Sequence, residues 1–437
     1  MVELAIGARE CGPGHVRANS FRPPDSVISG AFGGDERVLP RVTQARHSRS
    51  GRRGHVSEMK DLRELFPITE QVSYLNTATT GALSRPVSEA VKDCLDSRMS
   101  HGQCFDGEWA DRLVSVRRKV ARLIGATPDE VAVVNSTVEG LSMVAGGIHW
   151  HQGDNVVANS LEFPGNIYPW MSLKDRFGVD LRIAPAKDGR VILSDLFSAV
   201  DDRTRVVSVS FVEFSNGFKN DLKAIGSFCR ERGIYFVVDA IQGLGVIPLD
   251  VRESKIDFLA AAAFKWLLGP LGIGCFYCRK ELLDDVWLIR PGYDSVVGTY
   301  DEHGDLVELD YNYVLRPNAE RFEGTSHSFL GVYGFDAALD LIEEAGVSNI
   351  HSHTLTLIDM LVSGLQEKGG YRILSSLKPG ERSSIISLAH SDLESREIVQ
   401  RLADAGVIVA LREGAVRVSP HFYNNEADIE RLLANLP

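Results

Sequence analysis

The chain has few cysteines, and none of them is arranged as a disulfide framework or a metal site. The six cysteines lie at positions 11, 94, 104, 229, 275 and 278 of 437 residues. Only Cys275 and Cys278 are close together. Their segment, GIGCFYC, is typical of a strand, in which residues three apart point to opposite faces. No second pair follows, so the sequence predicts reduced cysteines in a cytoplasmic protein and no bound metal.

Two further absences exclude classes of function. No apolar run approaches the roughly 20 residues that a membrane-spanning helix needs. The formal net charge of −12 leaves no excess of cations to neutralise phosphates, so we expect neither a membrane nor a nucleic-acid partner. A hydrophobic content of 44% and a charged content of 24% are typical of a globular enzyme. The length suits one large and one smaller domain.

Residues 1–58 differ from the rest of the chain. They are rich in Gly, Arg, Pro and Ser, contain no lysine, and show no sustained apolar period. They also lack the apolar stretch of a secretory signal. We expect 1–58 to be a disordered N-terminal extension, with the natural start at Met59, where globular patterning begins. A basic interaction tail is the alternative.

From about residue 60 to 330, short apolar runs alternate with helical segments. The runs expected to form strands are 130–135, 155–160, 180–185, 205–212, 234–240 and 257–263. Continuous apolar strands joined by helices indicate a mainly parallel sheet that is covered on both faces. The fold class is therefore α/β.

The remaining boundaries follow from the same pattern. We predict an N-terminal arm and entrance loop over 59–85, a large cofactor-binding domain over 86–329 and a smaller C-terminal α+β domain over 330–437. Two short strands, 385–389 and 415–419, are expected in the smaller domain.

Three unusual features follow predicted strands. Thr137 opens a helix after EVAVVN, where hydroxyl and backbone N–H groups form an anion site. Asp239 ends the apolar strand IYFVVD, where a carboxylate needs a cationic partner. Lys265 follows DFLAAAAF, and burial lowers the pKa of a lysine amine, which favours imine formation. Because ligands bind beyond the carboxyl ends of parallel strands, we expect these residues to share one site.

Each feature has an ordinary structural explanation: a helix cap, a strand-end turn, or a lysine that extends to solvent. Their combination matches a single cofactor. Pyridoxal 5′-phosphate (PLP) needs a phosphate cradle, a carboxylate opposite its ring nitrogen and a lysine imine. The sequence therefore predicts PLP, with Lys265 as the catalytic Schiff-base lysine and Asp239 paired with the pyridinium nitrogen.

The segments around these residues resemble a known family. VVDAIQGLGVIPLDV and DFLAAAAFKWLLGPLGIG are similar to the class V aminotransferase family, a branch of the fold type I PLP enzymes. That branch includes cysteine desulfurases, isopenicillin-N-epimerase-like proteins and kynureninase. The resemblance runs from YLNTATTG (74–81) to VRVSPHFYNNEADIERLL (416–433). It implies the PLP-dependent transferase fold type I and a homodimer that acts on a small amino-acid substrate.

The resemblance also implies roles for individual residues. Thr137 and the backbone at Val138 would bind the cofactor phosphate, and Gln242 would lie near the ring hydroxyl. Lys265 would move the Cα proton. The segment RFEGTSHS (321–328) would reach across the dimer, so that Ser328 touches the partner's phosphate. Three residues would contact the substrate: Arg417, which clamps the α-carboxylate, and Asn76 and Thr77 at the entrance.

The chain departs from many relatives at the cofactor. Ala262 and Phe264 stand where a serine and a histidine commonly help to hold the phosphate. Phe163 and Pro164 replace a histidine that stacks on the ring. Phe163 is expected to stack there instead, but it cannot move a proton.

These differences bear on the reaction. No cysteine follows Cys278, which disfavours a desulfurase that stores sulfur on its own thiol. LEFPGNIYPW and AIQGLG look nearest to the epimerase-like members. We predict an epimerase-like or C–S lyase-type enzyme that deprotonates Cα, with a transaminase as the alternative. A non-catalytic sensor of the same fold is a further alternative.

Overall fold

The computed structural model describes residues 59–102, 108–298, 311, 313–324 and 327–437. The extension predicted over 1–58 lies outside these residues. No helix within the described residues is both long and apolar enough to cross a membrane.

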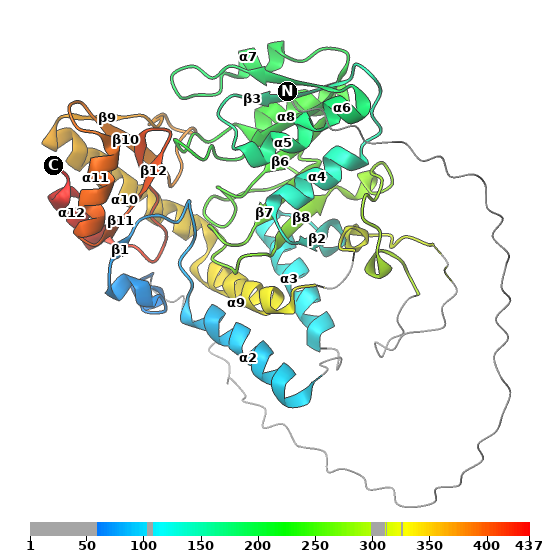
Figure 1. Ribbon diagram of the computed structural model, residues 1–437, viewed down its shortest axis with the longest axis horizontal. Coiled ribbons are helices and arrows are strands. Elements are labelled where there is room, and N and C mark those ends of the chain that lie inside the picture. The colour runs from blue at the N-terminus through cyan, green and yellow to red at the C-terminus, as the bar shows by residue number, and fades with distance from the viewer. Residues whose placement is uncertain (1–58, 103–107, 299–310, 312, 325–326) are drawn as a thin grey trace, which may run out of the picture. The chain divides into compact units, whose positions relative to one another are not determined.

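A seven-stranded sheet forms the centre of the larger core (Figure 1). Its strands are β2 (Val131–Val134), β3 (Asn155–Asn159), β4 (Asp180–Ala184), β5 (Thr204–Ser210), β6 (Tyr235–Asp239), β7 (Phe258–Ala262) and β8 (Gly274–Cys278). Their order is β2-β8-β7-β6-β5-β3-β4, and β8 runs antiparallel to the other six strands, which are parallel to one another. The mainly parallel sheet confirms the predicted fold class.

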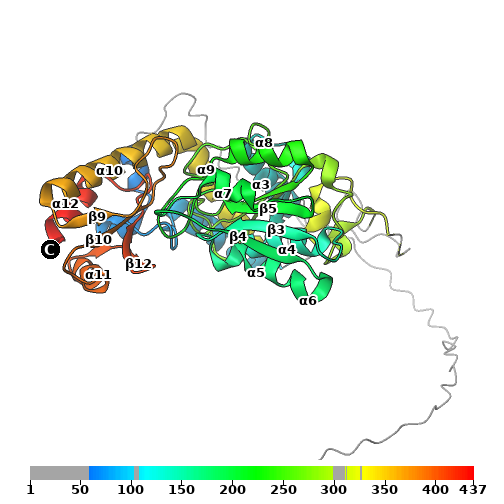
Figure 2. The same cartoon turned by 90° about the horizontal axis from the view of Figure 1, so that it is seen from above.

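Helices cover both faces of this sheet (Figure 2). One face carries α3 (Glu108–Ile124), α7 (Leu193–Ser198) and α8 (Leu222–Arg232), and the other carries α4 (Thr137–Gly147), α5 (Tyr168–Met171) and α6 (Leu173–Phe177). Strand side chains alternate between the two cores: in β2, Val131 and Val133 join the core of α3, and Ala132 and Val134 join that of α4. Burial on both faces explains why the strands are almost wholly apolar.

Helices α2 (Arg85–His101) and α9 (Phe329–Ala345) pack against each other, and α9 also packs on α3. Residues of α9, including Phe335 and Leu339, lie in the same core cluster as the sheet. The domain boundary predicted after residue 329 stays a prediction, and the first helix beyond it shares the larger core.

A second core is built around a four-stranded sheet of order β12-β13-β10-β9. Its strands are β9 (Tyr371–Ile373), β10 (Ile386–His390), β12 (Ala410–Arg412) and β13 (Ala415–Val418), and its helices are α10 (Val347–Lys368), α11 (Ser395–Asp404) and α12 (Glu426–Asn435). The sequence predicted only β10 and β13. The edge strands β9 and β12 have three residues each, too few to show an apolar alternation.

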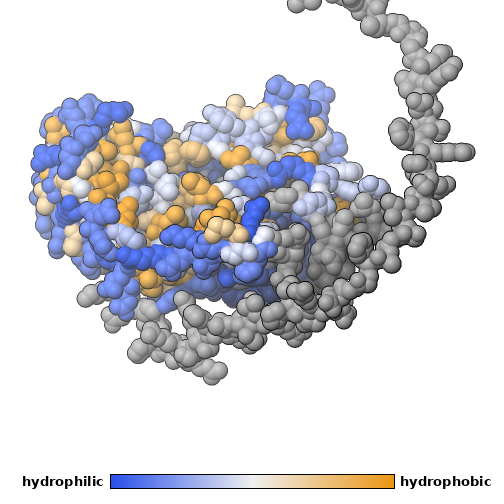
Figure 3. Space-filling view, turned by 60° about the horizontal axis from the view of Figure 1, so that its bottom comes forward, coloured by the Kyte–Doolittle hydropathy of each residue, from blue (hydrophilic) through white to orange (hydrophobic). Residues whose placement is uncertain are grey.

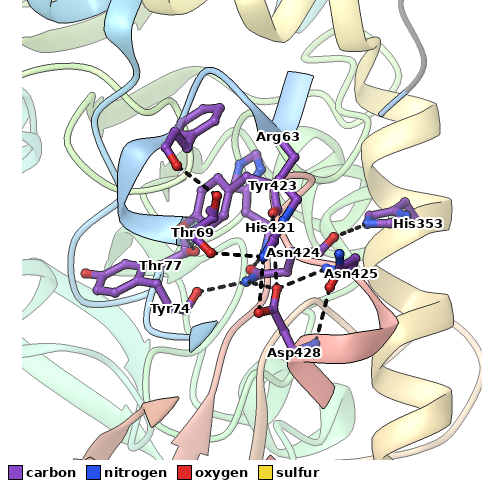
Figure 4. A network of polar contacts seen from close by, with 11 residues as sticks. Arg63, Thr69, Tyr74, Thr77, His353, His421, Tyr423, Asn424, Asn425 and Asp428 are labelled. Atoms are coloured by element: carbon purple, nitrogen blue, oxygen red, sulfur yellow. Dashed lines mark hydrogen bonds and ion pairs between the residues drawn. The ribbon is translucent and has the colours of Figure 1, made fainter. Parts of the chain in front are cut away.

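The N-terminal arm joins this second core. It contains α1 (Met59–Arg63) and β1 (Ser73–Tyr74), which pairs in parallel with β11 (Val407–Ile408). Figure 4 shows the polar network that holds it: Arg63 forms an ion pair of 2.7 Å with Asp428, and the Asn424 amide donates to the Tyr74 carbonyl over 3.0 Å. These contacts position the entrance loop, 76–81, which follows β1.

Short 3-10 helices complete the described secondary structure. They are η1 (Pro67–Glu70), η2 (Pro128–Glu130), η3 (Pro164–Asn166), η4 (Lys280–Leu282), η5 (Tyr293–Ser295) and η6 (Ala319–Phe322).

Candidate active site

Thr137, Asp239 and Lys265 lie at one edge of the larger sheet. Strand β8 is antiparallel to both β2 and β7, and β6 is parallel to β7, so the carboxyl ends of β2, β6 and β7 meet there. Thr137 is the first residue of α4, and Asp239 is the last residue of β6. The Ala262 backbone N–H at the end of β7 donates to Thr137 Oγ1 over 2.9 Å. The fold therefore brings together the three features that the sequence singled out.

Asp239 is a buried carboxylate, with only 4% of its surface exposed. It accepts a hydrogen bond of 3.0 Å from the Ile241 backbone N–H. Burial raises the pKa of Asp239 to about 6, and the positive charge of Lys265 acts in the opposite direction. A carboxylate held in this way is suited to pair with a cationic ring nitrogen.

Lys265 presents its amine to an apolar wall. The amine nitrogen lies 5.8 Å from the centre of the Phe163 ring and 5.7 Å from that of Phe264. Burial lowers the pKa of the Lys265 amine to about 8, although Asp239 opposes this change and Arg417 adds to it. Because its pKa is lowered, a larger fraction of the amine is neutral near pH 7, and only the neutral form can act as a nucleophile or accept a proton.

The entrance loop packs directly on the lysine loop. The Gly81 N–H donates to the Phe264 carbonyl over 2.8 Å, and a Cβ at Gly81 would lie 2.2 Å from the Lys265 carbonyl oxygen. Only glycine permits this approach. Gln242 ties the two loops together: its amide donates to the Ala78 carbonyl over 3.0 Å and accepts from the Trp266 indole over 2.8 Å.

Gln242 keeps one amide hydrogen beyond its bond to Ala78, because a side-chain amide has two donors. Its role near a ring hydroxyl stays a prediction.

Val138 and Phe163 are exposed residues at the solvent-facing rim of the candidate active site. They are 44% and 46% exposed, and a Cβ at Gly165 would lie 3.1 Å from Val138 and 3.2 Å from Phe163. The Phe163 ring stands edge-on to Phe214, with 5.1 Å between the ring centres and an angle of 73° between their planes. The Phe163 ring faces the Lys265 amine.

Arg417 is almost fully buried, at 1% exposure, although it carries a charge. Its guanidinium donates to the Phe214 carbonyl over 2.6 Å and to Thr79 Oγ1 over 2.7 Å. The Thr79 hydroxyl in turn donates to Asn76 Oδ1 over 2.7 Å. The structure thus joins Asn76 and Arg417, two residues predicted to contact the substrate, through Thr79.

Thr77 has a different setting. Its side chain is fully buried, and its hydroxyl lies 2.6 Å from the Tyr423 hydroxyl (Figure 4). The predicted contact of Thr77 with the substrate stays a prediction, and within the protein its hydroxyl is bonded to Tyr423. Thr77 holds the entrance loop on the second core, and Thr79 carries the polar group beside Arg417.

Ser328 is the exposed N-cap of α9, where its hydroxyl accepts from the Gly331 N–H over 3.4 Å. It lies beside Asn135 and Gly272 in a small hollow near the end of β2. Its contact with the phosphate of a partner subunit stays a prediction.

Residues 73–432 match the sequence model of the class-V aminotransferase family. The chain belongs to this family. It is 31% identical to the uncharacterized aminotransferase YcbU of Bacillus subtilis over 371 residues, which cover 85% of this chain and 95% of the relative. It is 28% identical to a probable cysteine desulfurase of Methanothermobacter thermautotrophicus, and the match covers 85% of this chain and 96% of that relative. The apo structure of a cysteine desulfurase from Thermococcus onnurineus NA1 is similar to this chain, with a TM-score of 0.76 and 25% sequence identity. The match covers 86% of this chain and 96% of that structure.

This class V family member is a PLP-dependent enzyme, and the geometry fits the cofactor. Asp239 and Lys265 are a buried acid and an amine at the same sheet edge. Because Thr137 Oγ1 accepts from Ala262, its hydroxyl hydrogen is free to donate to a phosphate at the start of α4. Ala262 and Phe264 add no side-chain donor, so the Thr137 hydroxyl and the first backbone N–H groups of α4 are the groups that would hold the phosphate, and this role stays a prediction.

The sequence did not single out His421, which supports the lysine loop of this enzyme. Its imidazole is fully buried, lies 3.1 Å from the Trp266 carbonyl and stacks on the Trp266 ring at 5.6 Å. Burial lowers the pKa of His421 to about 3, so the ring is neutral and positions the loop rather than carrying charge. Its place in SPHFYN, four residues after Arg417, is a signal that could have pointed to it.

Two buried carboxyl groups lie near Asp239. Asn159 donates to Glu162 over 2.6 Å and to Glu213 over 3.0 Å. Burial raises the pKa of Glu162 to about 7 and holds the pKa of Glu213 well above its usual range; the charge of Asp239 adds to both effects. The raised pKa values favour the neutral forms of Glu162 and Glu213, which lessens the negative charge around Asp239.

Proposed function

We propose that this class V enzyme is an amino-acid lyase of the C–S type. In this reaction Lys265 removes the Cα proton, and the bond from Cβ to a sulfur substituent breaks. The substituent leaves with the electron pair and takes up a proton. Addition of water then gives a 2-oxo acid and ammonia. The observation that carries this proposal is the Lys265 amine, which faces two aromatic rings and Asp239.

The chain's own residues have separate tasks in this proposal. Bound PLP supplies the electron sink that stabilises a carbanion at Cα. Asp239 holds the proton on the ring nitrogen, Thr137 binds the phosphate and Arg417 orients the substrate carboxylate. Phe163 lines the side where the proton is transferred.

Two other reactions are disfavoured by the residues that this chain has. An epimerase with two bases needs a second proton-transferring group, and Phe163 cannot serve as one. A persulfide relay needs an accessible thiol. The cysteines at 94, 229, 275 and 278 are all buried, and burial raises the pKa of Cys275 to about 12; Cys11 and Cys104 lie outside the described residues.

A transaminase is the second candidate. The relative YcbU, at 31% identity, is named as an aminotransferase. Lys265 would serve both reactions, since each begins with removal of the Cα proton. The two reactions differ in their later steps, because a transaminase keeps the amino group and passes it to a second 2-oxo acid.

Product analysis of the PLP-loaded protein tests the lyase proposal. We expect cysteine-type substrates to give a 2-oxo acid, ammonia and a thiol, with no 2-oxo acid acceptor present. Mass spectrometry and an ammonia assay measure the products. A strict requirement for an acceptor would support the transaminase instead, and deuterium exchange at Cα with inversion but no ammonia would support an epimerase.

We also propose that the enzyme is a homodimer. Figure 3 shows hydrophobic residues exposed on the side of the molecule that lies at the bottom of Figure 1. Met99 on α2 and Leu271 before β8 are 79% and 70% exposed, and Leu95 and Leu330 are also exposed. Helix α9 contacts both α2 and Pro270, so these apolar residues belong to neighbouring elements. An apolar surface of this kind commonly marks a protein interface.

Sedimentation of the full chain measures the oligomeric state. We expect a dimer, and we expect the Met99→Asp, Leu271→Asp double variant to sediment as a monomer because two charges would be desolvated in the interface. Leu393→Asp, at an exposed site before α11, is the matched control and should stay dimeric. A fully active wild-type monomer would contradict this proposal.

A further inference from the structure

A second arginine lies beside Arg417. Arg412, the last residue of β12, donates to Thr79 Oγ1 over 3.1 Å, and Arg417 donates to the same oxygen over 2.7 Å. The two arginines come from neighbouring antiparallel strands, with Ala410 opposite Arg417 in the register. Both guanidinium groups therefore reach the same point of the entrance loop.

Thr79 holds this pair without neutralising it. A hydroxyl can donate once and accept twice. The Thr79 hydroxyl donates to Asn76 Oδ1 and accepts from both arginines, so its hydrogen-bonding capacity is filled. It fixes the distance between the two cations and contributes no negative charge.

Apart from the Lys265 amine, whose pKa both arginines lower, the groups bonded to the two arginines are neutral. Their remaining bonds go to backbone carbonyls, from Arg412 to Leu411 and from Arg417 to Phe214. Within the part of the chain that the structure describes, neither forms an ion pair with a carboxylate, and the buried Arg417 Nε has no partner. Burying an uncompensated charge is costly. Burial and the charge of Arg412 lower the pKa of Arg417 to about 9.

We propose that the substrate is an amino acid with two anionic groups, its α-carboxylate on Arg417 and an acidic group carried by its sulfur substituent on Arg412. One carboxylate balances one guanidinium and matches its planar donors. Two guanidinium groups on one oxygen therefore call for two acidic groups that are close together, as in a cysteine whose sulfur carries a small acidic group. This inference rests on the proposed function, since it names the substrate class of the same site.

The alternative is that both arginines hold a single α-carboxylate. If Arg412 binds a second acidic group, a dicarboxylate should bind more tightly than a monocarboxylate. If both arginines hold one α-carboxylate, the two ligands should bind about equally. Succinate and propionate are suitable probes, because neither has the amine that reaction requires.

Calorimetric titration of the PLP-loaded full chain measures both dissociation constants. We expect wild type to bind succinate about 10- to 100-fold more tightly than propionate, the range for a hydrogen-bonded charge pair. Arg412→Gln should bring this ratio close to one. Arg412→Lys should keep part of the preference, because it retains the charge and loses the planar fork.

Arg372→Gln is the matched control. Arg372 is exposed on β9, at the opposite edge of the same sheet, and its replacement removes the same charge. We expect it to keep the wild-type ratio. The proposal is overturned if wild type shows no preference, or if Arg412→Gln weakens both ligands equally, which indicates a shared α-carboxylate. Because no turnover is needed, this result is independent of the product analysis that tests the lyase.

Discussion

Lys265→Ala is expected to lower kcat by about 10²- to 10⁴-fold, the range for loss of a positioned acid–base group. The physical reason is the setting of the amine, whose pKa is lowered to about 8 and whose nearest rings, Phe163 and Phe264, cannot accept a proton. Borohydride treatment of wild type, followed by peptide mass mapping, should place the reduced cofactor on Lys265.

Lys223→Ala is the control for this variant. Lys223 is an exposed lysine in an ion pair with Glu253 on the surface, and we expect its loss to leave turnover unchanged. A Lys265→Ala enzyme that keeps more than about a tenth of wild-type kcat, or a reduced adduct on another lysine, would remove the basis of the proposed chemistry.

Asp239→Asn should reduce kcat by about 100- to 1000-fold, as expected when one preorganised electrostatic group is lost. The amide oxygen can still accept from the Ile241 N–H, so the local structure is kept. The amide carries no charge, however, and cannot hold a proton on the ring nitrogen. Steady-state kinetics measures the change, and the cofactor's absorbance shows whether it stays bound.

Asp221→Asn provides the matched comparison. Asp221 caps α8 by accepting from the Ala224 N–H, and asparagine is an equally good cap. Its variant should retain wild-type kcat. Turnover in Asp239→Asn within about threefold of wild type would show that a charged partner for the ring nitrogen is not required, even with PLP bound.

The sequence by itself determined the α/β class and the strands that carry the site. Every strand of the larger sheet overlaps a segment that the sequence predicted as a strand, β8 within GIGCFYC included. The strands beside the site are largely apolar, because burial on both faces leaves little room for polar residues. Asp239 and Lys265 stand out against these runs, since a charge beside a buried strand needs a chemical or electrostatic reason. Such signals are local and can be read in one segment.

Only the tertiary structure decided how distant segments meet at the substrate end. Thr77 and Thr79 are alike in sequence, yet one bonds Tyr423 in the second core and the other bonds Arg412 and Arg417. These partners lie more than 300 residues away, and Arg412 is on β12, a strand too short to be recognised from its apolar pattern. A hydrogen bond depends on distances of a few tenths of an ångström between packed elements, and local sequence patterns do not encode those distances.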